Sequence, residues 1–264
     1  MPELKLNTIY NEDCFLTIQR IRESEIRPHI VLTSPPYNQK CHHIAGKKMY
    51  DSFNESDVSD YIQFTVDLFN ALDGILSQDG VILYNLSYNQ TYETFYKVLY
   101  NIIDQTPFTI PDKITWKKPF CIPVNTSPNK LSRLTEDVFV IARKTEVQTY
   151  KTSKKFLYKE KQNKFTCLFN YIEAKNNDGS TDLNKATFST ELVLGLLEMF
   201  GFSKDIVVYD PFMGTGTTAN GCVEFGCSYI GSEISPEQCQ YAEARVLKTL
   251  NLTKPRRKSG FRNT

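Results

Sequence analysis

Short apolar runs alternate with amphipathic segments along most of this chain, and this alternation restricts the fold more than any other feature. We expect strands at Leu6–Tyr10, His29–Thr33, Val81–Leu86, Lys113–Trp116, Asp137–Ala142, Ile206–Tyr209 and Tyr229–Ile234. The segments between them predict helices, because their apolar residues recur every three or four positions, most clearly from Val58 to Leu76. Strands that alternate with helices form a mostly parallel sheet with helices on both faces. The expected fold class is therefore α/β.

The length of 264 residues corresponds to one large or two small domains, and 41% hydrophobic with 23% charged residues is typical of globular proteins. No uncharged apolar run approaches the roughly 18 residues that span a bilayer. The first residues lack the charged-then-apolar layout of a secretory signal. Seven cysteines at irregular spacing do not indicate a disulfide framework. These features predict a soluble cytoplasmic protein with reduced thiols.

The net charge of +1 conceals two basic segments on an acidic remainder. Residues 143–164 carry a net charge of +6, and the basic tail, residues 252–264, carries +5 with no acidic residue. Localised positive charge favours contact with a polyanion. A solvated face and a frayed tail would give the same composition, so both interpretations stay open here.

A glycine-containing loop, Asp210-Pro-Phe-Met-Gly-Thr-Gly-Thr-Thr218, follows one of the apolar runs and precedes a helical segment. Glycines let a chain turn tightly and let a ligand approach the backbone closely. The next expected strand carries Glu233 near its end, where an acid is placed to hold ribose hydroxyls. The pattern predicts a site for an adenosine-containing cofactor. A tight strand-to-helix turn with an incidental glutamate is the alternative.

A second motif, Thr33-Ser-Pro-Pro-Tyr-Asn38, ends another apolar run. Two successive prolines fix the chain and remove two backbone donors, which leaves carbonyl groups free to accept hydrogen bonds. Ser34 adds a side-chain oxygen, and Tyr37 adds an aromatic ring. A planar amine needs acceptors for its hydrogens and a face to stack on, so this motif suits such a substrate. Taken alone, it is equally a rigid turn.

Together the two motifs resemble those of exocyclic-amino DNA methyltransferases that use S-adenosylmethionine. The order, with the catalytic motif first and the cofactor motif last, resembles the circularly permuted beta group, and the resemblance covers nearly the whole chain. It implies a Rossmann-like methyltransferase fold with a mostly parallel, seven-stranded sheet in a single domain, residues 1–264. It also implies that residues 144–183 form a small target-recognition insertion, in agreement with their charge.

The resemblance assigns roles to particular residues. The catalytic residues are expected to be Ser34, Pro35, Pro36 and Tyr37. The cofactor-binding residues are expected to be Asp13, Phe188, Asp210, Phe212, Gly214, Gly216, Thr217 and Glu233. The DNA-binding residues are expected to be Lys47, Lys48, Lys151, Lys154, Lys155 and Lys159, with an ordinary surface loop as the alternative around Lys47 and Lys48. The segment around Phe188 departs from the family pattern, because Asn184 and Ser189 stand near the places of a histidine and a proline.

In this family a serine at the first position of the catalytic motif is associated with N4 of cytosine and an aspartate with N6 of adenine. Ser34 therefore favours an N4-cytosine methyltransferase, which acts on a cytosine that has left the base stack. N6-adenine methylation is the nearby alternative, because a hydroxyl can serve either base. An RNA or protein-glutamine methyltransferase and a catalytically silent DNA-binding subunit are more distant alternatives.

The implied setting is restriction–modification, with DNA as partner, a cognate restriction endonuclease, a homodimer and no membrane. Chemistry of this kind needs no covalent enzyme intermediate, so no cysteine is assigned a role. No metal site is expected at Cys41-His42-His43, because the only other histidine is His29.

Overall fold

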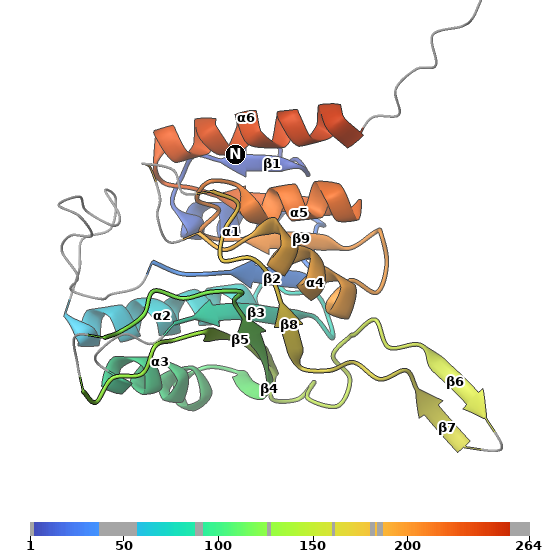
Figure 1. Cartoon of the computed structure of the whole chain (residues 1–264). Helices are drawn as coiled ribbons and strands as arrows, with labels where there is room; N and C mark the ends of the chain where they lie inside the picture. The colour runs from blue at the N-terminus through green and yellow to red at the C-terminus, as the bar shows by residue number, and fades with distance from the viewer. Residues whose placement is uncertain are drawn as a thin grey trace, which may run out of the picture.

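The computed structural model describes residues 3–36, 57–87, 92–125, 128–159, 162–179, 183 and 187–253 of the chain. An eight-stranded sheet has helices on both faces, and a separate two-stranded hairpin projects from one end of the molecule (Figure 1). The expected α/β fold is confirmed, with one strand more than the seven expected. None of the helices in these ranges is long and apolar enough to cross a membrane.

The described helices are α1 (Cys14–Glu23), α2 (Val58–Asp73), α3 (Tyr92–Gln105), α4 (Thr190–Phe200), α5 (Thr217–Phe225) and α6 (Pro236–Thr253). The strands of the large sheet are β1 (Thr8–Tyr10), β2 (Ile30–Thr33), β3 (Val81–Leu86), β4 (Phe108–Lys117), β5 (Thr135–Arg143), β8 (Tyr171–Glu173), β9 (Val207–Asp210) and β10 (Ser228–Ser232). The hairpin consists of β6 (Phe156–Lys159) and β7 (Gln162–Phe165). Helix α6 ends at Thr253, so the basic tail lies almost entirely outside the described residues.

The two faces of the sheet have separate cores, because side chains alternate along each strand. In β3, Val81 and Leu83 pack with apolar residues of α4, α5 and α6. Ile82 and Tyr84 of the same strand pack with residues of α1, α2 and α3. Every residue of β3 is buried, as expected for a central strand that has helices on both sides.

The strands follow the order β1-β10-β9-β2-β3-β5-β4-β8. Among the described strands of this large sheet, only β5 runs against its neighbours, since its pairs with β3 and β4 are antiparallel and the other pairs of the sheet are parallel. From β9 the chain passes to β10 on one side, and from β2 it passes to β3 on the other side. A crevice forms beyond the carboxyl ends of strands at such a change of direction, so the fold itself places a binding site after β9 and β2.

Candidate active site

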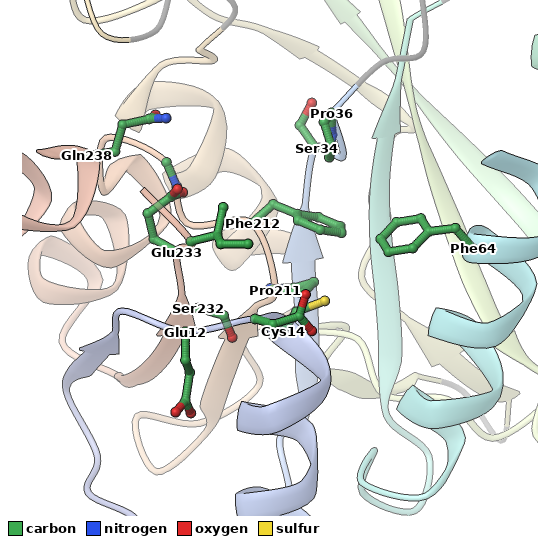
Figure 2. Close-up of a pocket in the computed structure, with 13 residues that line it drawn as sticks. Glu12, Cys14, Ser34, Pro36, Phe64, Pro211, Phe212, Ser232, Glu233 and Gln238 are labelled. Carbon is green, nitrogen blue, oxygen red and sulfur yellow. The ribbon is translucent and has the colours of Figure 1, made fainter. Parts of the chain in front are cut away.

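A cavity of about 260 Å³ lies beyond the carboxyl ends of β1, β2, β9 and β10 (Figure 2). It is lined by Glu12, Asp13, Cys14, Ser34, Pro36, Phe64, Pro211, Phe212, Gly214, Ser232, Glu233, Ile234 and Gln238. These residues come from four strand ends and from α1, α2 and α6. The structure thus brings the two sequence motifs, which are separated by about 175 residues, to one site.

Asp210 connects the two motifs. Its Oδ1 accepts a hydrogen bond of 2.7 Å from the hydroxyl of Thr33, and its Oδ2 accepts one of 2.6 Å from Thr218. Oδ1 also accepts from the backbone N–H of Phe212 at 3.0 Å. Burial raises the pKa of the Asp210 carboxyl to about 6, although the hydrogen bonds from Thr218 and Thr33 oppose the shift. Asp210 therefore fixes the shape of the glycine loop through these hydrogen bonds. It does not line the larger cavity.

Glu233 faces that cavity from the end of β10 (Figure 2). Its Oε2 accepts a hydrogen bond of 2.8 Å from the backbone N–H of Gly214, and its Oε1 accepts one of 2.8 Å from that of Ser235. Burial raises the pKa of the Glu233 carboxyl, and the backbone donors of Ser235 and Gly214 oppose this. Each carboxylate oxygen has two lone pairs, so each keeps the capacity to accept from one more hydroxyl.

The glycine loop makes a turn that only certain residues can form. Gly216 has a φ of +81°, and a Cβ atom there would lie 2.8 Å from the Cβ of Ala242 in α6. Gly216 therefore allows α5 and α6 to approach each other, and it lines neither of the cavities described here. Gly214 lines both of them.

Aromatic and capping residues form the remaining walls of the larger cavity. The rings of Phe212 and Phe64 lie side by side, with their centres 6.1 Å apart and their planes tilted by 44° (Figure 2). Asp13 caps the start of α1, because its Oδ1 accepts a hydrogen bond of 2.8 Å from the backbone N–H of Phe15. A flat apolar group can therefore enter beside Phe212, with Asp13 and Glu233 in the walls of the same cavity.

A second cavity, of about 40 Å³, shares Ser34, Phe212 and Gly214 with the first. Thr187, Phe188, Asp210 and Thr217 also line it. Phe188 reaches this position because α4 begins directly after it: the Ser189 hydroxyl accepts from the N–H of Leu192 at 3.2 Å and donates to the carbonyl of Lys175 at 2.8 Å. Ser34 is half-buried at the junction of the two cavities.

The catalytic motif is only partly described. Pro35 is buried and Pro36 lines the larger cavity. Tyr37, Lys47 and Lys48 lie outside the described residues, so their expected roles remain predictions.

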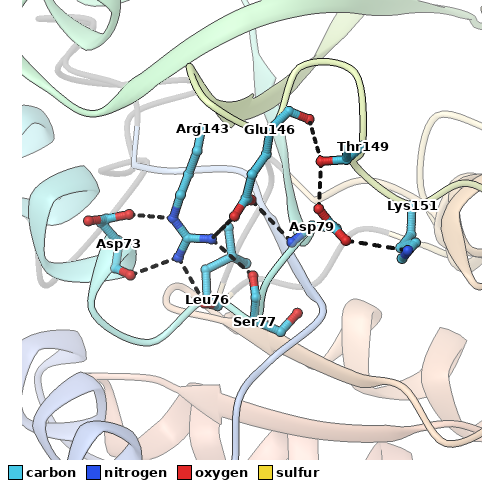
Figure 3. A network of polar contacts seen from close by, with 8 residues as sticks. All are labelled: Asp73, Leu76, Ser77, Asp79, Arg143, Glu146, Thr149 and Lys151. Atoms are coloured by element: carbon cyan, nitrogen blue, oxygen red, sulfur yellow. Dashed lines mark hydrogen bonds and ion pairs between the residues drawn. The ribbon is translucent and has the colours of Figure 1, made fainter.

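The basic segment contributes to the structure at its start (Figure 3). Arg143 donates to the Oδ1 of Asp73 at 2.5 Å, to the carbonyl groups of Leu76 and Ser77, and to Glu146. The Nζ of Lys151 lies 3.3 Å from the Oδ2 of Asp79. These contacts tie the chain after β5 to the loop that precedes β3.

That loop is at the amino end of β3, whereas Ser34 follows the carboxyl end of the neighbouring β2. Lys151 is therefore not near the cavities. Lys154 and Lys155 are exposed and lead into the hairpin, which projects from the same far end (Figure 1). The backbone of Lys159 ends β6. The structure does not bring these four lysines to the candidate active site.

No sequence motif singles out several residues that line the larger cavity, among them Glu12, Cys14, Phe64, Ser232 and Gln238, or Arg245, which contacts the glycine loop. Phe64 lies on α2 outside the apolar spacing of that helix, so no pattern in the sequence singles it out. Arg245 of α6 donates to the carbonyl of Thr215 at 3.2 Å and to the hydroxyl of Thr217 at 3.1 Å, and it forms an ion pair with Asp178. It thus braces the glycine loop from outside. Among the described residues, no group of three or more His, Cys, Asp or Glu side chains could hold a metal ion.

Known proteins share both the sequence pattern and the architecture. The type II methyltransferase M.MjaI of Methanocaldococcus jannaschii is 24% identical over 257 residues, covering 83% of this chain and 84% of that protein. M.HinfI of Haemophilus influenzae is 26% identical over 259 residues, covering 91% of this chain and 68% of that protein.

Solved structures of similar architecture include PvuII DNA methyltransferase, described as cytosine-N4-specific, with a TM-score of 0.63 at 17% identity over 92% of this chain and 90% of that one. The M1.HpyAVI–SAM complex has a TM-score of 0.59 at 20% identity over 90% of this chain and 98% of that one. These likenesses show the fold. The family model described as DNA methylase, N6_N4_Mtase, matches residues 29–244, and this chain belongs to that family.

Proposed function

We propose that this protein transfers a methyl group from S-adenosylmethionine to the exocyclic N4 amine of a cytosine in DNA. One observation carries the proposal: Ser34 of the Ser-Pro-Pro-Tyr motif lines both cavities, the larger together with Glu233 and the smaller together with Phe188. An acceptor for amine hydrogens thus lies beside a site suited to an adenosine.

The residues of the larger cavity fit the cofactor. The Glu233 carboxylate has acceptor capacity for both hydroxyls of a ribose, and Phe212 offers a face to a flat base. The smaller cavity, lined by Phe188 and Thr217, suits the amino-acid part of the same molecule. The solved complex of M1.HpyAVI with S-adenosylmethionine, which has the same fold, supports this assignment.

The reaction itself needs positioning more than acid–base chemistry. The bound cofactor supplies an electrophilic methyl group. The Ser34 hydroxyl and the Pro35 carbonyl accept the hydrogens of the target amine, which favours a more tetrahedral nitrogen with an available lone pair. Holding the two reacting atoms in line supplies much of the rate. Tyr37 is proposed to stack on the base, which must leave the duplex at a cost of a few kcal/mol.

Cytosine is proposed on the strength of the serine at position 34, and the N4-specific PvuII enzyme with the same fold supports it. Adenine N6 is the alternative, since the family includes both activities. The type II relatives support a role in restriction–modification. A cognate endonuclease and a homodimer remain predictions.

The decisive experiment identifies the product. The protein is incubated with unmethylated mixed-sequence DNA and labelled cofactor, and the DNA is digested to nucleosides for mass spectrometry. We expect N4-methylcytosine from the wild type and far less of it in the same time from Ser34→Ala, which controls for a contaminating methylase. N6-methyladenine would replace the assigned base, and the absence of any methylated nucleoside would refute the proposed function.

A further inference from the structure

The loop between β4 and β5 lies at the same edge of the sheet as the candidate active site. Leu86 at the end of β3 pairs with Asp137 of β5, which pairs in turn with Thr115 near the end of β4. The chain that leaves β4 at Lys117 therefore extends beyond the carboxyl ends of β2 and β3 (Figure 1). Three strand spacings separate β4 from β2, or roughly 14 Å, which is about four base pairs along a DNA duplex.

The described part of this loop, residues 119–125 and 128–134, exposes large apolar side chains. Phe120 is 66% exposed, and Ile122 and Leu131 are each 88% exposed. The whole stretch from Pro119 to Leu134 contains Lys130 and Arg133 and no acidic residue. Exposed apolar groups beside positive charge suit a partner that offers both base faces and phosphates.

The loop is anchored at its base. Lys118 forms an ion pair with Glu136 at 2.5 Å, and its backbone N–H donates to the carbonyl of Leu134 at 2.9 Å. The carbonyl of Phe120 accepts from the Nδ2 of Asn176 at 3.1 Å. Asn176 follows Lys175, whose carbonyl accepts from Ser189, so the loop is connected to the start of α4 beside Phe188. The exposed side chains are thus presented from a braced backbone at the entrance side of the site.

The hairpin of β6 and β7 is the competing candidate for DNA contact, because it belongs to the basic segment, residues 143–164, which carries a net charge of +6. It projects from the opposite end of the sheet, where Lys151 pairs with Asp79 before β3 (Figure 1). A duplex whose target base reaches Ser34 must lie across the carboxyl ends of the strands. The loop meets that requirement, and the hairpin does not.

We infer that the loop formed by residues 119–125 and 128–134 is the DNA-contacting surface beside the target base, with Phe120, Ile122 and Leu131 packing against bases and Lys130 contacting a phosphate. This inference rests on the proposed function and adds the surface through which the substrate is held. It also moves the principal DNA contact away from the basic segment that the sequence singled out.

The test compares two loop variants, each with a matched control variant, with the wild-type chain. The first is the triple variant Phe120→Ala, Ile122→Ala, Leu131→Ala; these side chains are exposed, so their truncation leaves no cavity. Its matched control is Leu157→Ala, Phe169→Ala, Leu252→Ala, which removes apolar side chains that are 47%, 80% and 77% exposed elsewhere. The third is Lys130→Ala, compared with Lys154→Ala. Affinity for mixed-sequence duplex DNA, cofactor affinity, methyl transfer and oligomeric state are measured for each.

We expect the loop triple variant to lose about tenfold or more in DNA affinity and in methyl transfer, as for the loss of a base-stacking contact, with cofactor affinity unchanged. Lys130→Ala should lower the slope of log affinity against log salt by about 0.9, and the two controls should match the wild type.

Unchanged DNA affinity and transfer in the loop triple variant would overturn the inference while the proposed function stands. If that variant instead changed the oligomeric state with DNA affinity intact, the loop would be a protein interface, and the inference would also be wrong. A wild-type chain that yields no methylated nucleoside would refute the proposed function and this inference together.

Discussion

The hydroxyl of Thr33 donates a hydrogen bond of 2.7 Å to the carboxylate of Asp210, a residue 177 positions further along the chain. Thr33 ends β2 directly before Ser34, and Asp210 ends β9 at the start of the glycine loop. Because both groups are buried, this bond fixes the catalytic motif relative to the loop that shapes the cofactor site.

Removing the Thr33 hydroxyl should weaken this connection. We expect Thr33→Val to lower the free energy of unfolding by about 1–2 kcal/mol, because a buried carboxylate loses one of its donors. Thr33→Ser keeps the hydroxyl and serves as the control. Denaturant unfolding of the two variants measures the difference, and a valine variant as stable as the serine variant would show that the bond contributes nothing.

The pKa of Asp210, raised to about 6 from an ordinary value of 3.8, predicts a pH dependence of stability. Between about pH 4 and 6 the folded state binds the proton more tightly than the unfolded state does. The contribution of Asp210 is therefore greatest below pH 4 and is lost as the pH rises through 6. The loss is about 3 kcal/mol. Asp210→Asn should remove this dependence. The free energy of unfolding is measured from pH 4 to 7 for the wild type and for Asp210→Asn, and equal slopes against pH would contradict the prediction.

Glu233→Gln should weaken cofactor binding by about 10- to 100-fold, because an amide offers one oxygen where the carboxylate offers two. Glu237→Gln, an exposed position at the start of α6, is the matched control. Titration calorimetry with S-adenosylmethionine measures both variants. Since burial raises the pKa of Glu233, cofactor affinity of the wild type should also fall as the pH is lowered and this carboxylate becomes protonated. Equal affinities for the two variants would remove Glu233 from the cofactor site.

Ser34→Ala should leave cofactor affinity within about twofold and slow methyl transfer by about 100-fold or more, because the amine loses a positioned acceptor. Ser203→Ala, at the far end of the sheet before β9, is the control. Single-turnover transfer to DNA at saturating cofactor separates chemistry from binding. Wild-type turnover in Ser34→Ala would end the assignment of this side chain to the reaction.

Gly216→Ala should destabilise the fold by about 3 kcal/mol, since the new Cβ atom would be strained by a φ of +81° and would lie 2.8 Å from Ala242. Gly226 has a similar φ of +84°, and a Cβ there would come no closer than 4.0 Å to any atom. Gly226→Ala therefore isolates the conformational cost, about 1 kcal/mol. If thermal unfolding showed that Gly216→Ala and Gly226→Ala lose the same free energy of unfolding, the contact between α5 and α6 at Gly216 would not be tight.

Much of the fold could be predicted because its elements carry strong local patterns. The expected strand Val81–Leu86 agrees with β3 at both ends, and the expected helix Val58–Leu76 begins where α2 begins, although α2 already ends at Asp73. Strand β4 begins at Phe108, before the expected Lys113–Trp116. A register shift between Thr109 and Asp112 interrupts the alternation of side chains, so the first half of the strand carries no clear pattern in the sequence. Strand β8, Tyr171–Glu173, has no buried residue, and only its pairing with β4 defines it.

By itself, the sequence determined the α/β class, the two motifs and about half of the residues that line the two cavities, because strand–turn–helix signals and glycine or proline loops are local properties. Only the tertiary structure decided which distant groups meet. It brought the Thr33 hydroxyl to the carboxylate of Asp210 and the ring of Phe64 next to that of Phe212. It also brought Arg143 into hydrogen-bond contact with Asp73. It also placed the basic segment away from the candidate active site. Lys151, Lys154 and Lys155 lie at the amino end of β3, whereas the cavities lie beyond the carboxyl ends of the strands. The direction of each strand decides which end of the sheet a segment reaches, and that direction depends on pairing across the whole sheet.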